Sequence, residues 1–522
     1  MQRELLRSIS ALLVCTAMLA LIGCSGGTTS GGGSNSGGNT TYTLSGTLSG
    51  LGSGQSVSLQ DNGKDTLSLS FNGAFSFPTS LDTGSAYAVT VQSHAPGIAC
   101  SVSNGSGTVG SSDVTGIGVS CTAGTETILY SFGASSSDGS LPTAGLIIDS
   151  AGNLYGTTGN GGVDVGGTVF KIGASDTETI LHSFGFAADG VGPDSDLVMD
   201  SAGNFYGTTV AGGANVGTVF KVSPGTGGTY TETILYSFRA SPADGASPHA
   251  GLIMDSAGNL YGTTYWGGAN CLALGGCGTA FKVAPDGTET VLHSFGASAT
   301  DGIWPHAGLV MDSAGNLYGT TVNGGANSDG HTAYGAGAVF KISPGAAGTY
   351  TETILYSFGA SATDGTWPGA GLILDNAGNL YGTTEYGGAN GYGAAGWGDG
   401  TVFKISASGT ETILYSFGAS ATDGGGPLAG LIMDSAGNLY GTTAFGGAND
   451  AAAGGDGTVF EIGASGTETI LYSFGASATD GQRPYAGLTM DGAGNLYGTT
   501  LYGGSNGLGS AVSGYGTVFV IN

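Results

Sequence analysis

Two stretches decide the fold, Glu352-Thr-Ile-Leu-Tyr-Ser-Phe358 and Ala370-Gly-Leu-Ile-Leu-Asp-Asn-Ala-Gly-Asn-Leu-Tyr-Gly-Thr-Thr384. The first is one β-like run, and the second holds two such runs joined by the tight-turn sequence Asp-Asn-Ala-Gly-Asn. A further β-like run, Gly400-Thr-Val-Phe-Lys-Ile405, follows. One unit of the sequence therefore predicts four short β-strands.

The same unit recurs along most of the chain. It begins at Glu126, Glu178, Glu232, Glu289, Glu352, Glu411 and Glu468, with spacings between 52 and 63 residues. Periods of this size are typical of solenoids, propellers and arrays. Because a solenoid would not tolerate so variable a period, four strands per unit favour a propeller. The sequence predicts an all-β chain with a seven-bladed β-propeller over residues 123–522.

The strand order predicts how the propeller closes. We assign Gly-Leu-Ile-Met-Asp to the innermost strand A, Asn-Leu-Tyr-Gly-Thr-Thr to B, Thr-Val-Phe-Lys-Ile to C and Glu-Thr-Ile-Leu-Tyr-Ser-Phe to the outer strand D. The first D run, Glu126 to Phe132, has no A, B or C run before it, and the last A, B and C runs, 487–521, have no D run after them. We expect the N-terminal strand to complete the last blade, which would remove two exposed sheet edges.

These units resemble the GloVer tandem repeat of bacterial choice-of-anchor surface proteins. The matching motifs are Glu-Thr-Ile-Leu-Tyr-Ser-Phe, Ala-Gly-Leu-Ile-Met-Asp-Ser-Ala-Gly-Asn-Leu-Tyr-Gly-Thr-Thr and Gly-Thr-Val-Phe-Lys, over about 397 residues of the chain. The resemblance implies a propeller on a bacterial surface. It implies no activity that can be assigned to individual residues.

The N-terminus reads as an export signal. Arg3 and Arg7 precede an apolar stretch that ends in Leu21-Ile-Gly-Cys24, similar to the lipobox of bacterial lipoproteins. The resemblance implies cleavage after residue 23, acylation of Cys24 and a lipid anchor in the cell envelope, with Ser25 pointing to the outer membrane; the alternative is an ordinary signal cleaved nearby. Residues 24–41 are a tether rich in Gly and Ser.

Residues 42–122 predict a small β-sandwich, because short alternating runs are separated by Asn-Gly and Gly-Ser turns. Phe71-Asn-Gly-Ala-Phe-Ser-Phe77 and Gly84-Ser-Ala-Tyr87 resemble prealbumin-like or carboxypeptidase-regulatory-like modules. Cys100 and Cys121 fit a disulfide that fastens its last strand. Cys271 and Cys277 fit a second disulfide within a propeller loop.

Composition narrows the choice of partners. The chain has 10 Lys and Arg against 37 Asp and Glu, and a net charge of −27. Nucleic acid is a poor partner for such a surface, because phosphate binding needs clustered cations. We expect a monomer without a cofactor. Of the acidic residues, 21 fall at three recurring positions of the repeat. We interpret them as residues that stabilise turns and strands rather than as Ca²⁺ ligands.

The connections between strands B and C vary most in length, and variable loops on a rigid scaffold often carry function. The residue before the Gly-Gly that opens this connection is aromatic in four repeats, and three Trp fall in adjoining loops. The candidate ligand-binding residues are Trp266, Trp304, Trp367, Tyr386, Trp397, Phe445 and Tyr502. Sugars stack on such rings, although the same rings could instead cover blade junctions.

The residue after a recurring Pro predicts a second candidate site. Asp194, His249 and His306 occupy this position in adjacent blades near the central axis, and two His with a carboxylate could hold a transition metal. The alternative is a set of ordinary polar residues lining a channel. His182 and His293 replace the Tyr of strand D and are interpreted as packing residues with satisfied polar atoms.

The sequence favours a surface-anchored, non-catalytic binding or adhesion lipoprotein, with a glycan or a surface protein as its partner. Zinc-protease and phosphate-loop motifs are missing from the sequence. Two alternatives stay open. A glycan-cleaving enzyme would need a pair of non-recurring carboxylates, drawn from Asp194, Asp196, Glu385, Asp399 and Asp456. The other is a structural envelope protein with no ligand.

Overall fold

The structure is a computed structural model of the 522-residue chain. It describes residues 40–52, 55–185, 189–214, 216–239, 241, 243–271, 274–327, 334–390, 398–449, 455–506 and 514–522. The predicted signal peptide, Cys24 and nearly all of the tether lie outside the described residues. Among the described residues, no helical segment has the length and apolar character needed to traverse a bilayer.

Residues 41–123 form two four-stranded sheets around one core. One sheet has the order β5 (Gly73–Ser76), β2 (Leu44–Ser49), β10 (Val114–Ala123), β8 (Ile98–Ser103). The other has the order β4 (Asp65–Leu69), β3 (Val57–Asp61), β7 (Ala86–His94), β9 (Ser106–Thr108), and β1 (Thr41–Tyr42) pairs with β6 (Leu81–Asp82). Cys100 and Cys121 face each other on β8 and β10 and form a disulfide, as expected from the sequence.

Residues 126–521 contain seven four-stranded antiparallel sheets, each in the order A, B, C, D. The A strands are β13 (Ile147–Ile148), β19 (Val198–Met199), β25 (Ile253–Met254), β31 (Val310–Met311), β37 (Ile373–Leu374), β43 (Ile432–Met433) and β49 (Thr489–Met490). The B strands are β14 (Leu154–Thr158), β20 (Phe205–Thr209), β26 (Leu260–Thr264), β32 (Leu317–Thr321), β38 (Leu380–Thr384), β44 (Leu439–Thr443) and β50 (Leu496–Thr500).

The outer half of each sheet consists of strands C and D. The C strands are β16 (Thr168–Ile172), β22 (Thr218–Pro224), β28 (Thr279–Val283), β34 (Ala338–Pro344), β40 (Thr401–Ile405), β46 (Thr458–Ile462) and β52 (Thr517–Ile521). The D strands are β17 (Glu178–Ser183), β23 (Tyr230–Ser237), β29 (Glu289–Ser294), β35 (Tyr350–Ser357), β41 (Glu411–Ser416), β47 (Glu468–Ser473) and β11 (Glu126–Ser131). Two short 3₁₀ turns, η1 (Thr226–Gly228) and η3 (Ala346–Gly348), connect C to D in two repeats.

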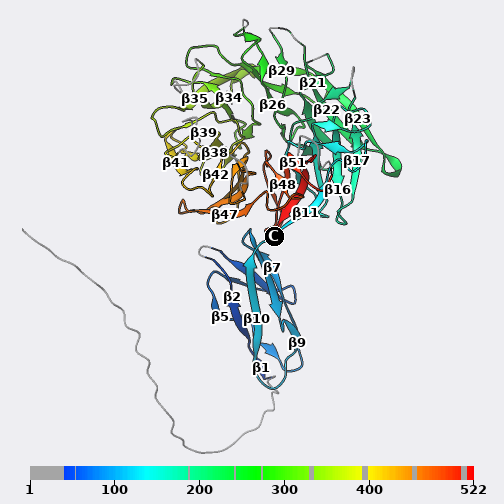
Figure 1. The fold of residues 1–522 in the computed structure, drawn as a ribbon, viewed down its shortest axis with the longest axis vertical. Coiled ribbons are helices and arrows are strands. Elements are labelled where there is room, and N and C mark those ends of the chain that lie inside the picture. Colours follow the sequence, from blue (N-terminus) through cyan, green and yellow to red (C-terminus); the bar gives the residue numbers. More distant parts are fainter. Residues whose placement is uncertain are drawn as a thin grey trace, which may run out of the picture.

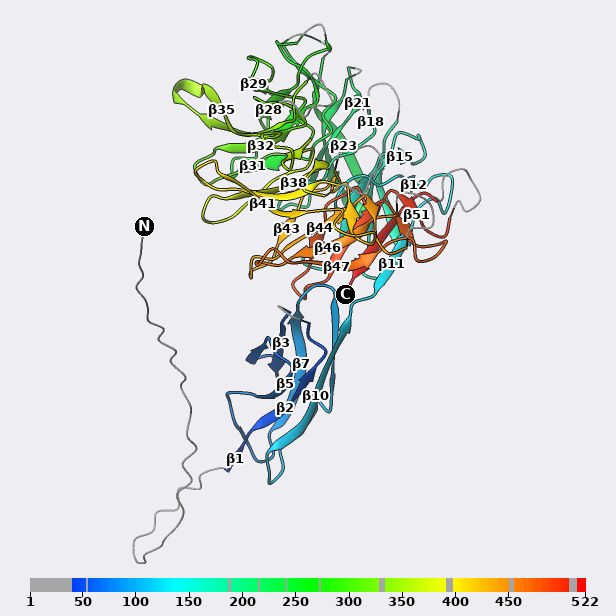
Figure 2. The same ribbon diagram turned by 60° about the vertical axis from the view of Figure 1, so that its left-hand side comes forward.

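The sheets are arranged around a ring, with the two-sheet N-terminal part below it (Figures 1 and 2). Strand β11, near the start of the repeats, pairs with β52 at the end of the chain, with Glu126 opposite Ile521 and Ser131 opposite Thr517. This is the pairing that the unmatched first D run predicts. The architecture is all-β and β-propeller-like.

Neighbouring sheets share buried aromatic pairs. A Phe after each D strand packs edge-on against a Phe of the next sheet's C strand, as Phe358 does against Phe403 at a centroid distance of 5.0 Å. Phe132 packs in the same way against Phe170, so this contact also joins the last sheet to the first. Toward the axis, the Thr499 hydroxyl donates to the Ala144 carbonyl at 3.1 Å, which repeats the Thr383 to Ala429 bond. Burial of such rings is a major source of stability.

The A–B turn has the structural role that the sequence predicts for its Asp. Asp375 accepts hydrogen bonds from the backbone N–H groups of Ala377 and Asn379, from the Asn379 amide and from the Tyr381 hydroxyl, at 2.7–3.1 Å. These bonds fix a turn in which Gly378 has a φ of +80°, a conformation that favours glycine. The recurring Asp at this position therefore stabilises the A–B turn.

Candidate functional site

A cavity of about 780 Å³ opens at one end of the ring axis. The residue after the recurring Pro contributes to its wall from every repeat, in the order Thr143, Asp194, His249, His306, Gly369, Leu428 and Tyr485. The other lining residues are Tyr265, Trp304, Val322, Asn323, Tyr334, Trp367, Glu385, Tyr386 and Phe445. The cavity is thus assembled from equivalent positions that differ in side chain, which gives a symmetric ring an asymmetric site.

Seven two-stranded sheets hold the rim of this face, each pairing the D–A connection with the B–C connection. They are β12 (Gly139–Ser140) with β15 (Asn160–Gly161), β18 (Gly190–Val191) with β21 (Ala211–Gly212), β24 (Gly245–Ala246) with β27 (Trp266–Gly267), β30 (Gly302–Ile303) with β33 (Asn323–Gly324), β36 (Gly365–Thr366) with β39 (Tyr386–Gly387), β42 (Gly424–Gly425) with β45 (Phe445–Gly446) and β48 (Gly481–Gln482) with β51 (Tyr502–Gly503). The aromatic position before Gly-Gly therefore lies on a short strand rather than in an irregular loop.

Four of the aromatic residues singled out from the sequence line the cavity: Trp304, Trp367, Tyr386 and Phe445. Trp367 packs against Tyr386 with ring centroids 5.5 Å apart. Trp304 lies nearly parallel to Tyr265 at 6.0 Å, and its indole N–H donates to the Gly276 carbonyl at 3.3 Å. These rings are half-buried, so each has both a packed side and an open side.

The other aromatic candidates lie elsewhere. Trp266 packs against Trp304 with ring centroids 5.4 Å apart and does not line the cavity, although Tyr386 and Phe445 do so from the equivalent position. Tyr502 is also outside the lining, and the Arg483 guanidinium lies 6.0 Å from its ring centroid and 5.4 Å from that of Phe445. Trp397 lies outside the described residues.

Trp304 and Trp367 adopt left-handed backbone conformations, with φ of 59° and 61°. The position before the recurring Pro is left-handed in all seven repeats: it is Gly192 or Gly426 in two of them, with φ of 66° and 61°, and Leu141, Ser247 or Arg483 in the other three, with φ of 52–56°. Such a conformation is unfavourable for a residue with a bulky side chain, and strain of this kind collects at functional sites. Both Trp residues face the cavity from these positions.

The three residues of the candidate metal site line the same cavity. The His249 and His306 rings stack at 5.3 Å, and Asp194 accepts a hydrogen bond from the Thr143 hydroxyl at 3.0 Å. Burial lowers the pKa of His249. Burial, and to a lesser extent the charge of the neighbouring His249, lower the pKa of His306 to about 4. The His306 side chain is nevertheless exposed to the solvent of the cavity. Both imidazoles are therefore neutral at pH 7. The described groups of three potential ligands within 4.8 Å of one another lie at other positions.

Of the five non-recurring carboxylates, Asp194 and Glu385 line the cavity. Burial raises the pKa of both groups, against a hydrogen bond from Thr143 to Asp194 and one from Tyr386 to Glu385. Asp196 lies deeper, in a channel along the axis of about 350 Å³, and accepts from the Gly145 N–H. Asp399 and Asp456 do not line either space.

The sequence reasoning missed Tyr265, Val322 and Tyr334 as lining residues. Tyr265 and Val322 directly follow Gly-Thr-Thr, as does Glu385, so the position that leaves strand B faces the cavity. The shared position of these residues after Gly-Thr-Thr could have been recognised in the sequence. Tyr334 belongs to a long B–C connection, in which its position is equivalent to that of Trp397 in the next repeat.

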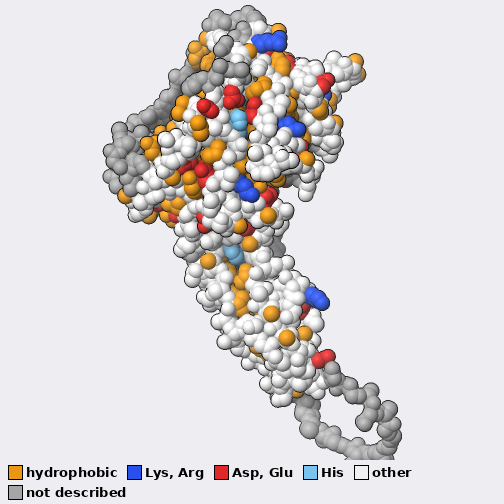
Figure 3. Space-filling view, turned by 90° about the vertical axis from the view of Figure 1, so that its right-hand side faces the viewer, with side chains coloured by type: hydrophobic (Ala, Val, Ile, Leu, Met, Phe, Trp, Pro, Cys, Tyr) orange, Lys and Arg blue, Asp and Glu red, His pale blue; other side chains and the backbone are white. Residues whose placement is uncertain are grey.

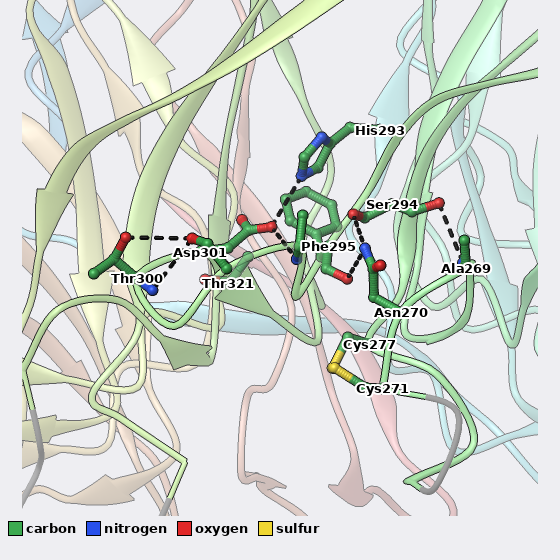
Figure 4. A network of polar contacts seen from close by, with 12 residues as sticks. Ala269, Asn270, Cys271, Cys277, His293, Ser294, Phe295, Thr300, Asp301 and Thr321 are labelled. Carbon is green, nitrogen blue, oxygen red and sulfur yellow. Dashed lines mark hydrogen bonds and ion pairs between the residues drawn. A yellow bond between two sulfur atoms is a disulfide. The ribbon is translucent and has the colours of Figure 1, made fainter.

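Cys271 and Cys277 form the second predicted disulfide, within the B–C connection of the third repeat. The Asn270 amide of the same connection donates to the carbonyls of Ser294 and Phe295 at 2.8 and 3.1 Å (Figure 4). The disulfide and these bonds fasten this loop to the end of strand D. Its role is structural.

Solved structures resemble the chain only distantly. One is the domain named as the extracellular domain of a one component system from B. thetaiotaomicron, with 11% identity, 75% of this chain and 39% of that chain covered, and a TM-score of 0.45. A puromycin hydrolase mutant has 13% identity, 70% and 50% coverage and a TM-score of 0.45. A luciferin-regenerating enzyme has 14% identity, 65% and 95% coverage and a TM-score of 0.36. The chain thus spans 39% of the first structure and 50% of the second.

No curated protein matches the sequence at a significant level. The family model described as the Gloeobacter/Verrucomicrobia repeat matches residues 23–271, 84–333, 166–395 and 273–512. Together these tandem matches span almost all of the chain outside its first 22 residues. The chain belongs to the Gloeobacter/Verrucomicrobia repeat family.

Proposed function

We propose that the repeats form a seven-bladed β-propeller closed by β11, and that the cavity at its axis binds a neutral or cationic glycan without cleaving it. The observation that carries this proposal is the convergence of Trp304, Trp367, Tyr386 and Phe445 on one cavity from three separate repeats. The volume of about 780 Å³ lies within the range of roughly 300–1,000 Å³ that is common for ligand sites.

Charge supports the choice of ligand. The described lining residues include Asp194 and Glu385 but no Lys or Arg. The chain carries a net charge of −27, and its Lys and Arg side chains are isolated from one another on the face visible in Figure 3. An anionic polymer would be repelled by such a surface. Sugar rings stack on aromatic faces without needing charge.

Single substitutions of the two cavity Trp residues test this proposal. Trp304→Ala and Trp367→Ala should each weaken binding to a glycan found on a glycan array by about tenfold, if each ring contributes about 1.4 kcal/mol. Phe71→Ala is the control, because Phe71 is 82% exposed and lies in the N-terminal module. Unchanged affinity in both Trp variants, or a large drop in melting temperature in both, would contradict a binding platform.

Glycan cleavage is a second candidate, and the pairing of Asp194 with Glu385 in one cavity favours it. Two carboxyl groups with raised pKa values in an aromatic pocket could supply the acid and the base of a glycosidase. Release of reducing ends from an array-positive glycan, abolished by Asp194→Asn and by Glu385→Gln, would establish cleavage. Binding with no product release supports the non-catalytic function.

We further propose that the protein is exported and held in the cell envelope by acylation of Cys24, in the outer membrane. Two disulfides support an oxidising compartment. Cys24→Ser should abolish incorporation of labelled palmitate and release the protein from the membrane fraction. Unchanged labelling and fractionation would show that Cys24 is not the anchor.

A further inference from the structure

Each pair of neighbouring repeat sheets meets at a small polar cluster, which we call a junction cluster. At the first junction the Tyr130 hydroxyl bonds to Asp138 Oδ2 at 3.0 Å and to Glu178 Oε2 at 3.2 Å. Tyr130 lies on β11, the D strand of one sheet, and Asp138 comes after that strand, while Glu178 begins the D strand of the next sheet. Tyr236, Tyr356, Tyr415 and Tyr472 bond in the same way to the Asp of their own repeats at 2.9–3.0 Å.

Two junction clusters have His in place of this Tyr, namely His182 with Asp189 and Glu232, and His293 with Asp301 and Glu352. In each, one ligand atom from every residue lies within 4.8 Å of the other two. His293 Nε2 lies 3.3 Å from Asp301 Oδ2, and His182 Nε2 lies 3.6 Å from Asp189 Oδ2. Figure 4 shows the His293 ring directed at the Asp301 carboxylate.

Both His clusters contain buried polar atoms without a hydrogen-bond partner among the described residues. These atoms are His182 Nε2 and Glu232 Oε1 in one cluster, and Asp301 Oδ1 and Glu352 Oε1 in the other. Asp301 is only 5% exposed. This corrects the interpretation of His182 as a satisfied packing residue. Among the described residues, the Glu Oε1 atom lacks a partner at all seven junctions, and Asp364 Oδ1 lacks one at a Tyr junction, so these atoms do not set the His clusters apart. The imidazole nitrogen does, and at His182 it has no hydrogen-bond partner within the described part of the chain. Buried polar atoms left unpaired are costly, which favours a further partner where an imidazole and two carboxylates meet.

We propose that each His junction cluster binds one divalent first-row transition ion, such as Zn²⁺, through one imidazole nitrogen and two carboxylate oxygens. A tetrahedral Zn²⁺ has ligand atoms about 2.0–2.2 Å from the ion and hence about 3.4 Å from one another. The separation of 3.3 Å between His293 Nε2 and Asp301 Oδ2 already matches this spacing. A water molecule would complete the coordination.

The ligand type decides the class of ion. An imidazole nitrogen with two carboxylates suits zinc and similar transition ions, whereas Ca²⁺ takes six to eight oxygen ligands. Each ion would join two sheets, because His182 and Asp189 come from one side of the junction and Glu232 from the other. Such an ion would act as a clamp that opposes separation of neighbouring sheets. Tyr in the remaining junction clusters donates to the Asp and offers no nitrogen ligand, so these clusters lack the imidazole of the proposed ligand set.

The repeats themselves supply a matched control. His182→Tyr and His293→Tyr restore the residue found at the five other junctions, so the double variant should fold. The full chain is stripped of metal, dialysed against Zn²⁺, and its zinc content is measured by mass spectrometry. We expect wild type to exceed the double variant by two equivalents of zinc, and each single variant by one. Zn²⁺ should raise the melting temperature of wild type more than that of the double variant.

Comparison with the double variant also separates these clusters from the cavity histidines. Zinc held by His249 and His306 would remain in the double variant and cancel in the difference. Should the Tyr variants fail to fold, Glu232→Gln with Glu352→Gln removes one ligand from each cluster at nearly unchanged shape. Equal zinc content in wild type and the folded variants, or none in wild type, would overturn the proposal.

Discussion

At the scale of single residues, the residue before the recurring Pro is held in a left-handed conformation, and Trp304 and Trp367 are two of the seven residues at this position. Equivalent positions carry Gly192 and Gly426, for which a positive φ has no steric cost. A left-handed conformation costs a residue with a Cβ about 1–2 kcal/mol. The chain tolerates this cost at five positions, which are Leu141, Ser247 and Arg483 besides the two Trp residues. The left-handed backbone therefore belongs to the fold of every repeat, and the position of the two rings in the cavity wall is what marks them as candidate ligand contacts.

A pair of substitutions at Trp304 measures this strain. Trp304→Gly and Trp304→Ala both remove the ring, but only Gly relieves the backbone, so the Gly variant should be more stable by about 1 kcal/mol. Trp266 has no positive φ and lies on rim strand β27, so there the Ala variant should be the more stable one. Urea unfolding of the four variants gives the comparison. A Trp304→Gly variant less stable than Trp304→Ala would rule out strain.

At the scale of elements, close packing of strand B on strands A and C decides which residues the repeat accepts. The Gly of each Leu-Tyr-Gly-Thr-Thr run lies over a buried Phe. A Cβ at Gly382 would lie 2.7 Å from Phe403 Cζ and 2.8 Å from Leu372 Cδ2. Only glycine allows the sheet to pack at this distance.

We therefore expect Gly382→Ala to destabilise the protein by about 1–3 kcal/mol, because extra volume in a packed core forces its neighbours to move. Gly371→Ala is the control, since a Cβ there meets no atom within 4 Å and φ is not positive. The control should be neutral or slightly stabilising. Denaturant titrations measure both, and equal stability of the two variants would show that the site is not close-packed.

The junction clusters that contain Tyr predict a dependence of stability on pH. Burial, and then Asp364, raise the pKa of Glu411 from 4.5 to about 7. Between these values the native state holds a proton that the unfolded state has lost, so the free energy of unfolding should fall as pH rises from about 4.5 to 7. Above both values the dependence should level off.

Glu411→Gln isolates one junction, because the amide carries no titrating proton. Its urea midpoint should fall less steeply over this pH range than that of wild type, with EDTA present in both to exclude bound metal. Asp375 serves for comparison, since hydrogen bonds from Asn379, Tyr381 and Ala377 outweigh burial and lower its pKa, so its contribution is lost only at acid pH. Parallel slopes for wild type and the variant would show that Glu411 does not titrate here.

At the scale of the whole molecule, the sequence predicted the repeat count, the strand order and the partner of the first D strand, because four recurring runs with one left over at each end allow few arrangements. It also predicted that the residues after the recurring Pro lie together near the central axis, because equivalent residues of a symmetric ring lie at the same distance from its axis. All seven of these residues line one cavity.

Other features could not be predicted. The rim strands contain only two residues each, many of them Gly, and therefore carry no hydrophobic pattern. Because the sequence does not reveal the rim sheets, it does not show which aromatic side chains point into the cavity. Trp266 was therefore grouped with Trp304, although only Trp304 lines the cavity. The His junction clusters depend on contacts between repeats 50 or more residues apart, such as His182 with Glu232.

Closure of the ring by β11 is the central claim, and hydrogen exchange of an Ile128→Pro variant tests it most directly. Proline removes a backbone donor from the strand that pairs with β52, where Ile128 lies opposite Phe519. Ile413→Pro is the matched control, because Ile413 lies opposite Phe403 in another sheet. We predict that Ile128→Pro lowers the protection of the amides of residues 487–521, far along the chain, and that Ile413→Pro lowers that of residues 370–405 instead. Full protection of residues 487–521 in the folded Ile128→Pro variant would contradict closure.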